Sequence, residues 1–124
     1  MFIGIHATWD VYSCNADKLS FVPYIKETLH TITATLNLEE LNEAFKQFEP
    51  IGVTGFILLA ESHISIHTWP EHNYAAIDVF SCKEFDANVV TKLLGELFES
   101  NKIELNQLDR GSLEIAKGSN MGVK

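Results

Sequence analysis

The sequence has little of what marks secreted, membrane or nucleic-acid-binding proteins. It contains only two cysteines, Cys14 and Cys82, too few for a small domain held together by disulfides. No apolar run approaches the roughly 20 residues of a membrane-spanning helix, and the first residues lack the basic and apolar regions of a signal peptide. We therefore expect a cytoplasmic protein with reduced thiols and no contact with a membrane.

Positive charge is also scarce. The chain has 9 Lys and Arg residues against 17 Asp and Glu, which gives a net charge of −8. Proteins bind nucleic acid through clustered Lys and Arg, so this composition disfavours nucleic acid as a partner. The negative charge fits either solubility or a mild attraction for a cationic substrate, and composition does not separate the two.

Apolar residues, in contrast, are plentiful. They make up 46% of the 124 residues, which is enough for one packed core, and the length predicts a single domain over residues 1–124. Residues at helical spacing predict two helices, one capped by Ser20 and ending near Leu36, and one capped by Asp86. Residues 38–48 fit a helix by their spacing and a strand by their length. The other apolar segments predict strands at 2–14, 53–60, 63–67, 74–82, 103–108 and 113–116.

This pattern predicts an α+β fold: a two-layer α/β sandwich with two helices on one face of an antiparallel sheet. Segments 53–60 (VTGFILLA) and 74–80 (YAAIDVF) are apolar on both strand faces, yet two helices can cover only one face of a sheet. The uncovered face needs a partner, and the simplest partner is a second copy of the chain. We therefore expect a homodimer.

Residues 60–82 (AESHISIHTWPEHNYAAIDVFSC) gather most of the groups that could carry chemistry. One interpretation is a metal site built from His63, His67, His72, Glu61 and Glu71. The alternation of apolar residues predicts a strand here, which would place the first two histidines about 13 Å apart, too far to share one ion. We therefore expect no metal.

A second interpretation is a serine hydrolase. Ser62 lacks the Gly-x-Ser-x-Gly turn of many hydrolases. Asp78 could orient a histidine, but nothing in the sequence marks an oxyanion hole.

A third interpretation is self-processing, in which the Ser62 hydroxyl attacks the carbonyl of Glu61 and converts the peptide bond to an ester. A turn at Ser62 would let His67 reach it, whereas on one uninterrupted strand the two side chains would point to opposite faces. β-Elimination of the ester would cut the chain and leave dehydroalanine. Hydrolysis of that residue would leave a pyruvoyl group at position 62.

The segment GVTGFILLAESHISIHTWPEHNYAAIDVFSC resembles the short bacterial and archaeal S-adenosylmethionine decarboxylases, which are self-processing pyruvoyl enzymes. The run E-S-H-x-[ST]-I-H-[ST]-x-P-E…D-V-[FY]-[ST]-C is long and chemically unusual, which makes the resemblance highly specific. The resemblance covers most of the chain and extends to Gly4, His6, Asp10, Cys14, Phe48 and Arg110-Gly111.

The resemblance implies a cut between Glu61 and Ser62 that yields chains 1–61 and 62–124. The pyruvoyl group would be the cofactor, and it would bind the substrate amino group as a Schiff base. The roles implied for single residues are pyruvoyl precursor for Ser62, processing for His67 and Thr54, and proton donor for Cys82.

The resemblance also implies a substrate. Phe48 and Trp69 would hold the adenine ring of S-adenosylmethionine, and Glu71 would bind its ribose hydroxyls. The product would be decarboxylated S-adenosylmethionine, the aminopropyl donor for spermidine synthesis. The family fold is an α/β sandwich that dimerises with its sheets inside and its active sites at the interface, and it favours a strand at 38–48.

Two residues depart from the family pattern. Lys83 stands where a glycine often follows the catalytic cysteine, and Thr54 stands where serine is frequent and is stiffer because its side chain is branched at Cβ. His6 and Cys14 are assigned to structure. Two alternatives stay open: a sister enzyme that uses the same chemistry on ornithine or arginine, and a non-catalytic regulatory subunit whose chain stays uncut.

Overall fold

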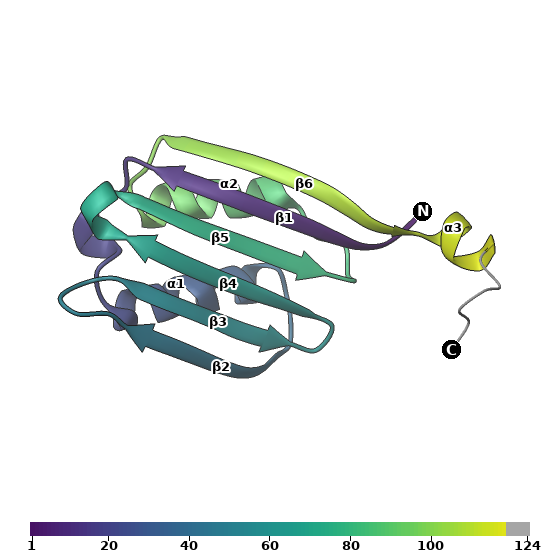
Figure 1. The fold of residues 1–124 in the computed structure, drawn as a ribbon, viewed down its shortest axis with the longest axis horizontal. Coiled ribbons are helices and arrows are strands. Elements are labelled where there is room, and N and C mark those ends of the chain that lie inside the picture. The colour runs from purple at the N-terminus through teal and green to yellow at the C-terminus, as the bar shows by residue number, and fades with distance from the viewer. Residues whose placement is uncertain (119–124) are drawn as a thin grey trace.

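The computed structural model describes residues 1–118, which form one antiparallel sheet with helices packed on one of its faces (Figure 1). The strands lie in the order β2-β3-β4-β5-β1-β6, and every neighbouring pair is antiparallel. The strands are β1 (Phe2–Tyr12), β2 (Glu40–Gln47), β3 (Val53–Leu59), β4 (Ser62–Trp69), β5 (Tyr74–Ser81) and β6 (Lys102–Ser112). The helices are α1 (Val22–Thr35), α2 (Ala87–Leu97) and α3 (Leu113–Gly118), with short 3-10 helices η1 (Ala16–Lys18) and η2 (Pro70–His72). The predicted α+β sandwich is confirmed.

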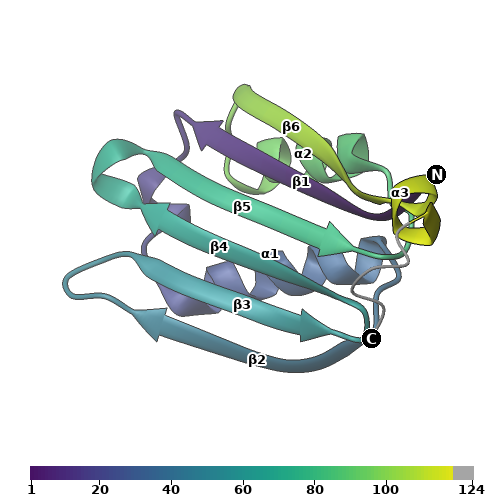
Figure 2. The same cartoon turned by 45° about the vertical axis from the view of Figure 1, so that its right-hand side comes forward.

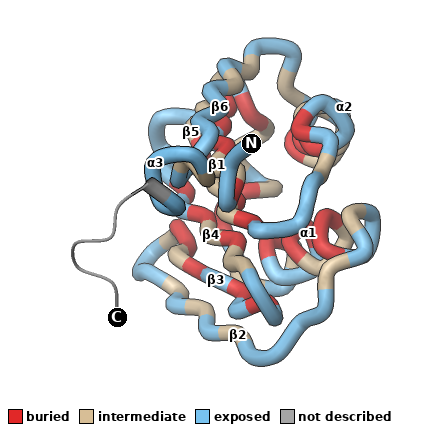
Figure 3. Tube along the Cα trace, turned by 90° about the vertical axis from the view of Figure 1, so that its right-hand side faces the viewer, coloured by how far each residue is buried: buried red, intermediate tan, exposed pale blue. Residues whose placement is uncertain are grey.

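Helices α1 and α2 cover the same face of the sheet (Figures 1 and 2). Helix α1 packs against β2 and β3, and α2 packs against β1 and β6. Side chains alternate along a strand, so every second residue of the central strands, such as Trp9, Ile66 and Ile77, points into the layer below the helices and is buried. Figure 3 shows the buried positions on the surfaces where sheet and helices meet. Within residues 1–118, no helix combines the length and apolar composition needed to cross a membrane.

The start of α1 differs from the prediction, and that of α2 agrees with it. Ser20 does not cap α1: its hydroxyl donates to the Ala16 carbonyl at 2.7 Å. The N–H of Val22 instead donates to the side-chain oxygen of Gln47, on β2, at 2.9 Å. The Asp86 carboxylate does cap α2, because it accepts from the N–H two residues further on. A tertiary contact therefore replaces the local cap at α1.

The ambiguous segment 38–48 contains the edge strand β2, as the family resemblance favoured. Phe45 packs over Gly55 of β3, where an added Cβ would lie 2.2 Å from the phenyl ring. Leu41 and Phe48, which helical spacing would place on a buried face, are exposed. Pairing with β3 thus decides the conformation of this segment.

The C-terminal part also differs from the prediction. Strand β6 runs unbroken to Ser112, and the segment predicted as a last strand, 113–116, lies in helix α3 beyond the end of the sheet (Figure 1). Gly111 has φ of 72°, a left-handed conformation that glycine adopts without strain.

The face of the sheet opposite α1 and α2 is not covered by any part of the described chain, and we call it the open face. Phe56 and Leu58 of β3 lie on it and are 43% and 45% exposed, whereas the alternating residues Ile57 and Leu59 are buried. In a single chain the segment 53–60 is therefore buried on one face only, although it is apolar on both. One apolar face remains available to a partner.

Candidate active site

Ser62 is the first residue of β4 and directly follows the two-residue turn Ala60–Glu61. It is in register with Leu59 across the hairpin and with Ser81 at the end of β5. Its hydroxyl donates a hydrogen bond to Ser81 Oγ at 2.9 Å. The tight hairpin therefore holds the predicted nucleophile at one end of the sheet, beside the end of β5.

The carbonyl that this hydroxyl would attack belongs to Glu61. Its oxygen accepts a hydrogen bond from the backbone N–H of Cys82 at 3.4 Å. An N–H aimed at a carbonyl oxygen stabilises the negative charge that develops there during nucleophilic attack. Cys82 itself is exposed. The structure thus brings together three residues of the sequence prediction, and with Ser81 they form what we call the serine half-site: Glu61, Ser62, Ser81 and Cys82.

A cavity of about 430 Å³ opens beside this half-site. Lys83 lines this cavity, and its ammonium donates to the Asn37 carbonyl at 3.0 Å, just past the C-terminal end of α1, where a cation is favoured. The departure from the family pattern at position 83 therefore ties the β5–α2 connection to α1. The cavity is lined by Asn37, Leu38, Glu39, Leu59, Ala60, Glu61, Ser62 and Lys83.

The other predicted residues gather around a second cavity of about 440 Å³, and we call them the histidine half-site: Phe48, Thr54, His67, Trp69 and Glu71. His67 Nδ1 lies 3.1 Å from Thr54 Oγ1, and the rings of His67 and Trp69 are 6.2 Å apart. The two half-sites are far apart. Figure 1 shows the β2–β3 and β4–β5 connections at one end of the sheet, and the β3–β4 turn and the end of β5 at the other.

The expectation that a turn at Ser62 lets His67 reach it in the same chain is wrong. The turn lies one step earlier, at Ala60–Glu61, and β4 runs uninterrupted from Ser62 to Trp69. Five residues of strand separate two side chains by about 17 Å and place them on opposite faces. The two halves of the predicted site therefore do not meet within one chain.

Comparison with known proteins identifies the family of this chain. A family model described as S-adenosylmethionine decarboxylase matches residues 5–111. The S-adenosylmethionine decarboxylase proenzyme of Clostridium botulinum strain Langeland is 36% identical over 114 residues, covering 91% of this chain and 98% of that protein. The chain belongs to the S-adenosylmethionine decarboxylase family.

Other relatives agree with this assignment to the S-adenosylmethionine decarboxylase family. The S-adenosylmethionine decarboxylase proenzyme of Persephonella marina is 40% identical over 117 residues, covering 93% of this chain and 87% of that one. The crystal structure of the adenosylmethionine decarboxylase from Aquifex aeolicus matches with a TM-score of 0.83 at 35% identity, covering 90% of this chain and 93% of that chain. The predicted family is confirmed, and the fold of the chain is that of a solved relative.

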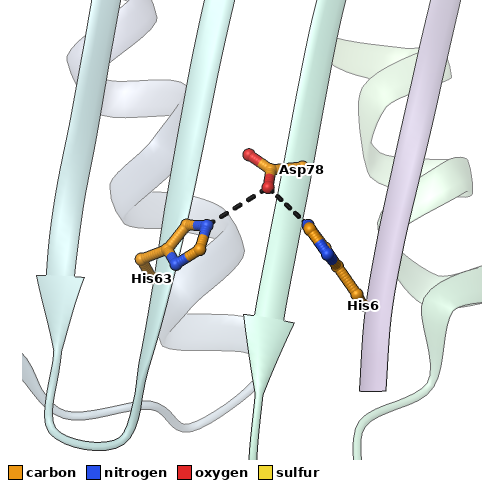
Figure 4. Close-up of side chains that lie close together, drawn as sticks. All are labelled: His6, His63 and Asp78. Carbon is orange, nitrogen blue, oxygen red and sulfur yellow. Dashed lines mark hydrogen bonds and ion pairs between the residues drawn. The ribbon is translucent and has the colours of Figure 1, made fainter. Parts of the chain in front are cut away.

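A further polar cluster lies on the open face of this decarboxylase-family sheet (Figure 4). His6 and His63 both direct Nε2 at Asp78 Oδ2, at 2.7 and 3.1 Å. These groups have the types and spacing of metal ligands. Arg110, however, places a guanidinium nitrogen 3.4 Å from His6 Nδ1, and a guanidinium can only donate.

The contact with Arg110 favours one tautomer of His6. With Arg110 as the donor, Nδ1 is the acceptor and Nε2 donates its proton to Asp78. A histidine that binds a metal through Nε2 needs the opposite arrangement, with the proton on Nδ1 and an acceptor beside it. This tautomer fits a hydrogen-bond network better than a metal site. His6, assigned to structure from the sequence, belongs to this network.

The same network sets the acidity of Asp78. Burial raises the pKa of this carboxyl, but hydrogen bonds from Ser65, His6 and His63 outweigh burial and hold the pKa below its usual value. A carboxyl group whose pKa is lowered by folding stabilises the folded state at pH values above its pKa in the unfolded chain, which is about 3.9. That stabilisation is lost as the pH falls through the folded pKa.

We expect the stability advantage of the wild type over Asp78→Asn to be largest above about pH 5 and to shrink below about pH 4. Denaturant unfolding at fixed protein concentration, repeated across this pH range, measures the difference. Asp109→Asn removes an exposed carboxylate on β6 and serves as the control. A difference between wild type and Asp78→Asn that stayed constant down to pH 2 would contradict the assignment.

Sequence reasoning missed the partner of Ser62. Ser81 occurs in the family run as the [ST] position before the cysteine, but only strand register reveals that it faces Ser62. Cys14, assigned to structure, is buried and donates its S–H to the Val11 carbonyl. Burial raises the pKa of the Cys14 thiol to about 11, so this thiol stays protonated at neutral pH.

Proposed function

We propose that this chain is a self-processing, pyruvoyl-dependent S-adenosylmethionine decarboxylase that works as a homodimer with two shared active sites. The observation that carries the proposal is the placement of the serine and histidine half-sites at opposite ends of one sheet (Figure 1). Groups that must act on one substrate cannot do so across that distance. A second chain therefore has to supply one half of each site.

The open face supports this dimer. Phe56 and Leu58 lie on it between the two half-sites, and covering each of them would stabilise the dimer by about 1 kcal/mol. In such a dimer, two open faces stack against each other. The two-fold axis lies between the two sheets and is perpendicular to the strands. This symmetry places the serine end of one sheet beside the histidine end of the other at both ends of the dimer. Ser62 lies on the helix-covered face of β4, so within this dimer its side chain would meet the partner's half-site around the end of the sheet.

The serine half-site fits the formation of a pyruvoyl group. The Ser62 hydroxyl donates to Ser81 at the end of β5, the Glu61 carbonyl oxygen accepts from the N–H of the next residue, Cys82, and Ser62 borders a cavity. When formed, the group supplies a ketone that withdraws electrons from the substrate bond that loses carbon dioxide. Cys82, exposed beside it, would donate the proton to the product carbon. The partner's His67, oriented by Thr54, would assist processing.

The histidine half-site fits a nucleoside. Phe48 and Trp69 are 46% and 40% exposed, so their rings are open to a ligand in the cavity that they border. Aromatic faces can stack on adenine and attract the positive sulfonium group. Glu71 borders the same cavity, where its carboxylate can accept hydrogen bonds from two ribose hydroxyls.

Intact-protein mass spectrometry and an assay of carbon dioxide release test the proposal together. We expect fragments 1–61 and 62–124, the latter with a keto-acyl end, and release from S-adenosylmethionine roughly tenfold or more faster than from ornithine or arginine. Release from ornithine or arginine alone would instead support a sister enzyme. A chain that stays whole and inactive on prolonged incubation would support a regulatory subunit.

A further inference from the structure

Ser81 is a fully buried serine at the end of β5, and it faces Ser62 across the β4–β5 pairing. Its Oγ accepts two hydrogen bonds, one from the Ser62 hydroxyl at 2.9 Å and one from the backbone N–H of Lys83 at 3.0 Å. The second bond anchors the oxygen to the backbone of the following loop. The geometry points to Ser81 as a positioning residue that aims the Ser62 hydroxyl at the Glu61 carbonyl during self-processing.

The hydrogen bond has a direct consequence for the nucleophile. Because Ser62 donates its proton to Ser81, the lone pairs of Ser62 Oγ stay free for the carbonyl carbon. The Glu61 oxygen is held at the same time by the Cys82 N–H at 3.4 Å. Two consecutive residues, Ser81 and Cys82, therefore hold the two reacting groups, and fixing reacting groups near their attack geometry lowers the barrier.

The step that Ser81 would assist needs no group from outside the chain, and the inference about Ser81 rests on the proposed function. The Ser62 Oγ forms a bond to the Glu61 carbonyl carbon, and the peptide C–N bond breaks. The hydroxyl proton ends on the freed Ser62 nitrogen, so no oxidant, reductant or further reagent is needed. Ser81 itself is unchanged, which makes it a positioning residue rather than a catalytic one.

Ser81→Ala tests this inference. Intact-protein mass spectrometry, started on freshly made protein, measures the rate at which the 61–62 bond is cut. We expect cutting to slow by about tenfold or more, because the Ser62 hydroxyl is no longer held. Hydroxylamine, which cleaves esters, should release no extra fragments, because the reaction of this variant is slowed before the ester forms. Ser81→Thr keeps the hydroxyl and should restore cutting. Ser20→Ala, which removes another buried serine hydroxyl, is the matched control and should cut as the wild type does.

Two results would overturn the inference: wild-type cutting in Ser81→Ala, or an ester in that variant that hydroxylamine cleaves. Thermal unfolding checks that each variant is folded. If Ser81→Ala does not fold, the nearly isosteric Ser81→Cys replaces it. Its thiol accepts a hydrogen bond from Ser62 more weakly than a hydroxyl does, so we expect the chain to be cut slowly. Cutting at the wild-type rate in Ser81→Cys would overturn the inference. A wild-type chain that never cuts would overturn the proposed function as well, so the two failures are distinguishable.

Discussion

Ser62→Ala should remain a single uncut chain of 13.9 kDa without decarboxylase activity. The substitution removes the hydroxyl that attacks the Glu61 carbonyl, so the peptide bond survives and no ketone forms at position 62. We expect activity to fall by roughly 10³-fold or more, as when other covalent catalytic groups are removed. Intact-protein mass spectrometry reports the cut, and carbon dioxide release from S-adenosylmethionine reports the activity.

The matched control for this variant is Ser65→Ala, three residues further along β4. The Ser65 hydroxyl donates to Asp78 on the open face and touches neither Glu61 nor Ser62. This variant should therefore still be cut at the 61–62 bond. Normal cutting in Ser62→Ala would refute the assignment of the nucleophile.

Mixing two inactive variants should restore activity if each site is shared between chains. Ser62→Ala keeps a complete histidine half-site, and His67→Ala keeps a complete serine half-site. In a mixed dimer, one of the two sites combines both intact halves. With equal amounts and random pairing, half of the dimers are mixed, so about a quarter of all sites should become active. Co-expression of the two chains, followed by mass spectrometry and the carbon dioxide assay, measures this recovery.

A second pair of variants provides the control for complementation. Ser62 and Cys82 belong to the same half-site of one chain, linked by the contact between the Cys82 N–H and the Glu61 carbonyl. Mixing Ser62→Ala with Cys82→Ala therefore creates no site with both groups intact and should not restore activity. If Ser62→Ala and His67→Ala also failed to complement each other in dimers shown to be mixed, the shared site would be refuted.

Local sequence patterns predicted most of the elements but not their ends. The strand at 53–60 and the Asp86 cap were predicted correctly because an apolar run of strand length and a helix cap are local features of the sequence. The cap of α1 was wrong because the acceptor is Gln47, which is 25 residues away in sequence. The segment 38–48 was ambiguous for a similar reason, since its pairing with β3 decides its conformation.

The sequence by itself determined which chemical groups this protein carries, because a serine after glutamate, two aromatic residues and a cysteine can be read directly from the order of the residues. The tertiary structure alone decided which of these groups can meet. Strand parity and hairpin register put Ser62 beside Ser81 and Cys82, and they put His67 with Thr54 at the far end of the sheet. Side-chain contacts across a sheet depend on the pairing of distant strands, and residue order along one strand does not specify that pairing.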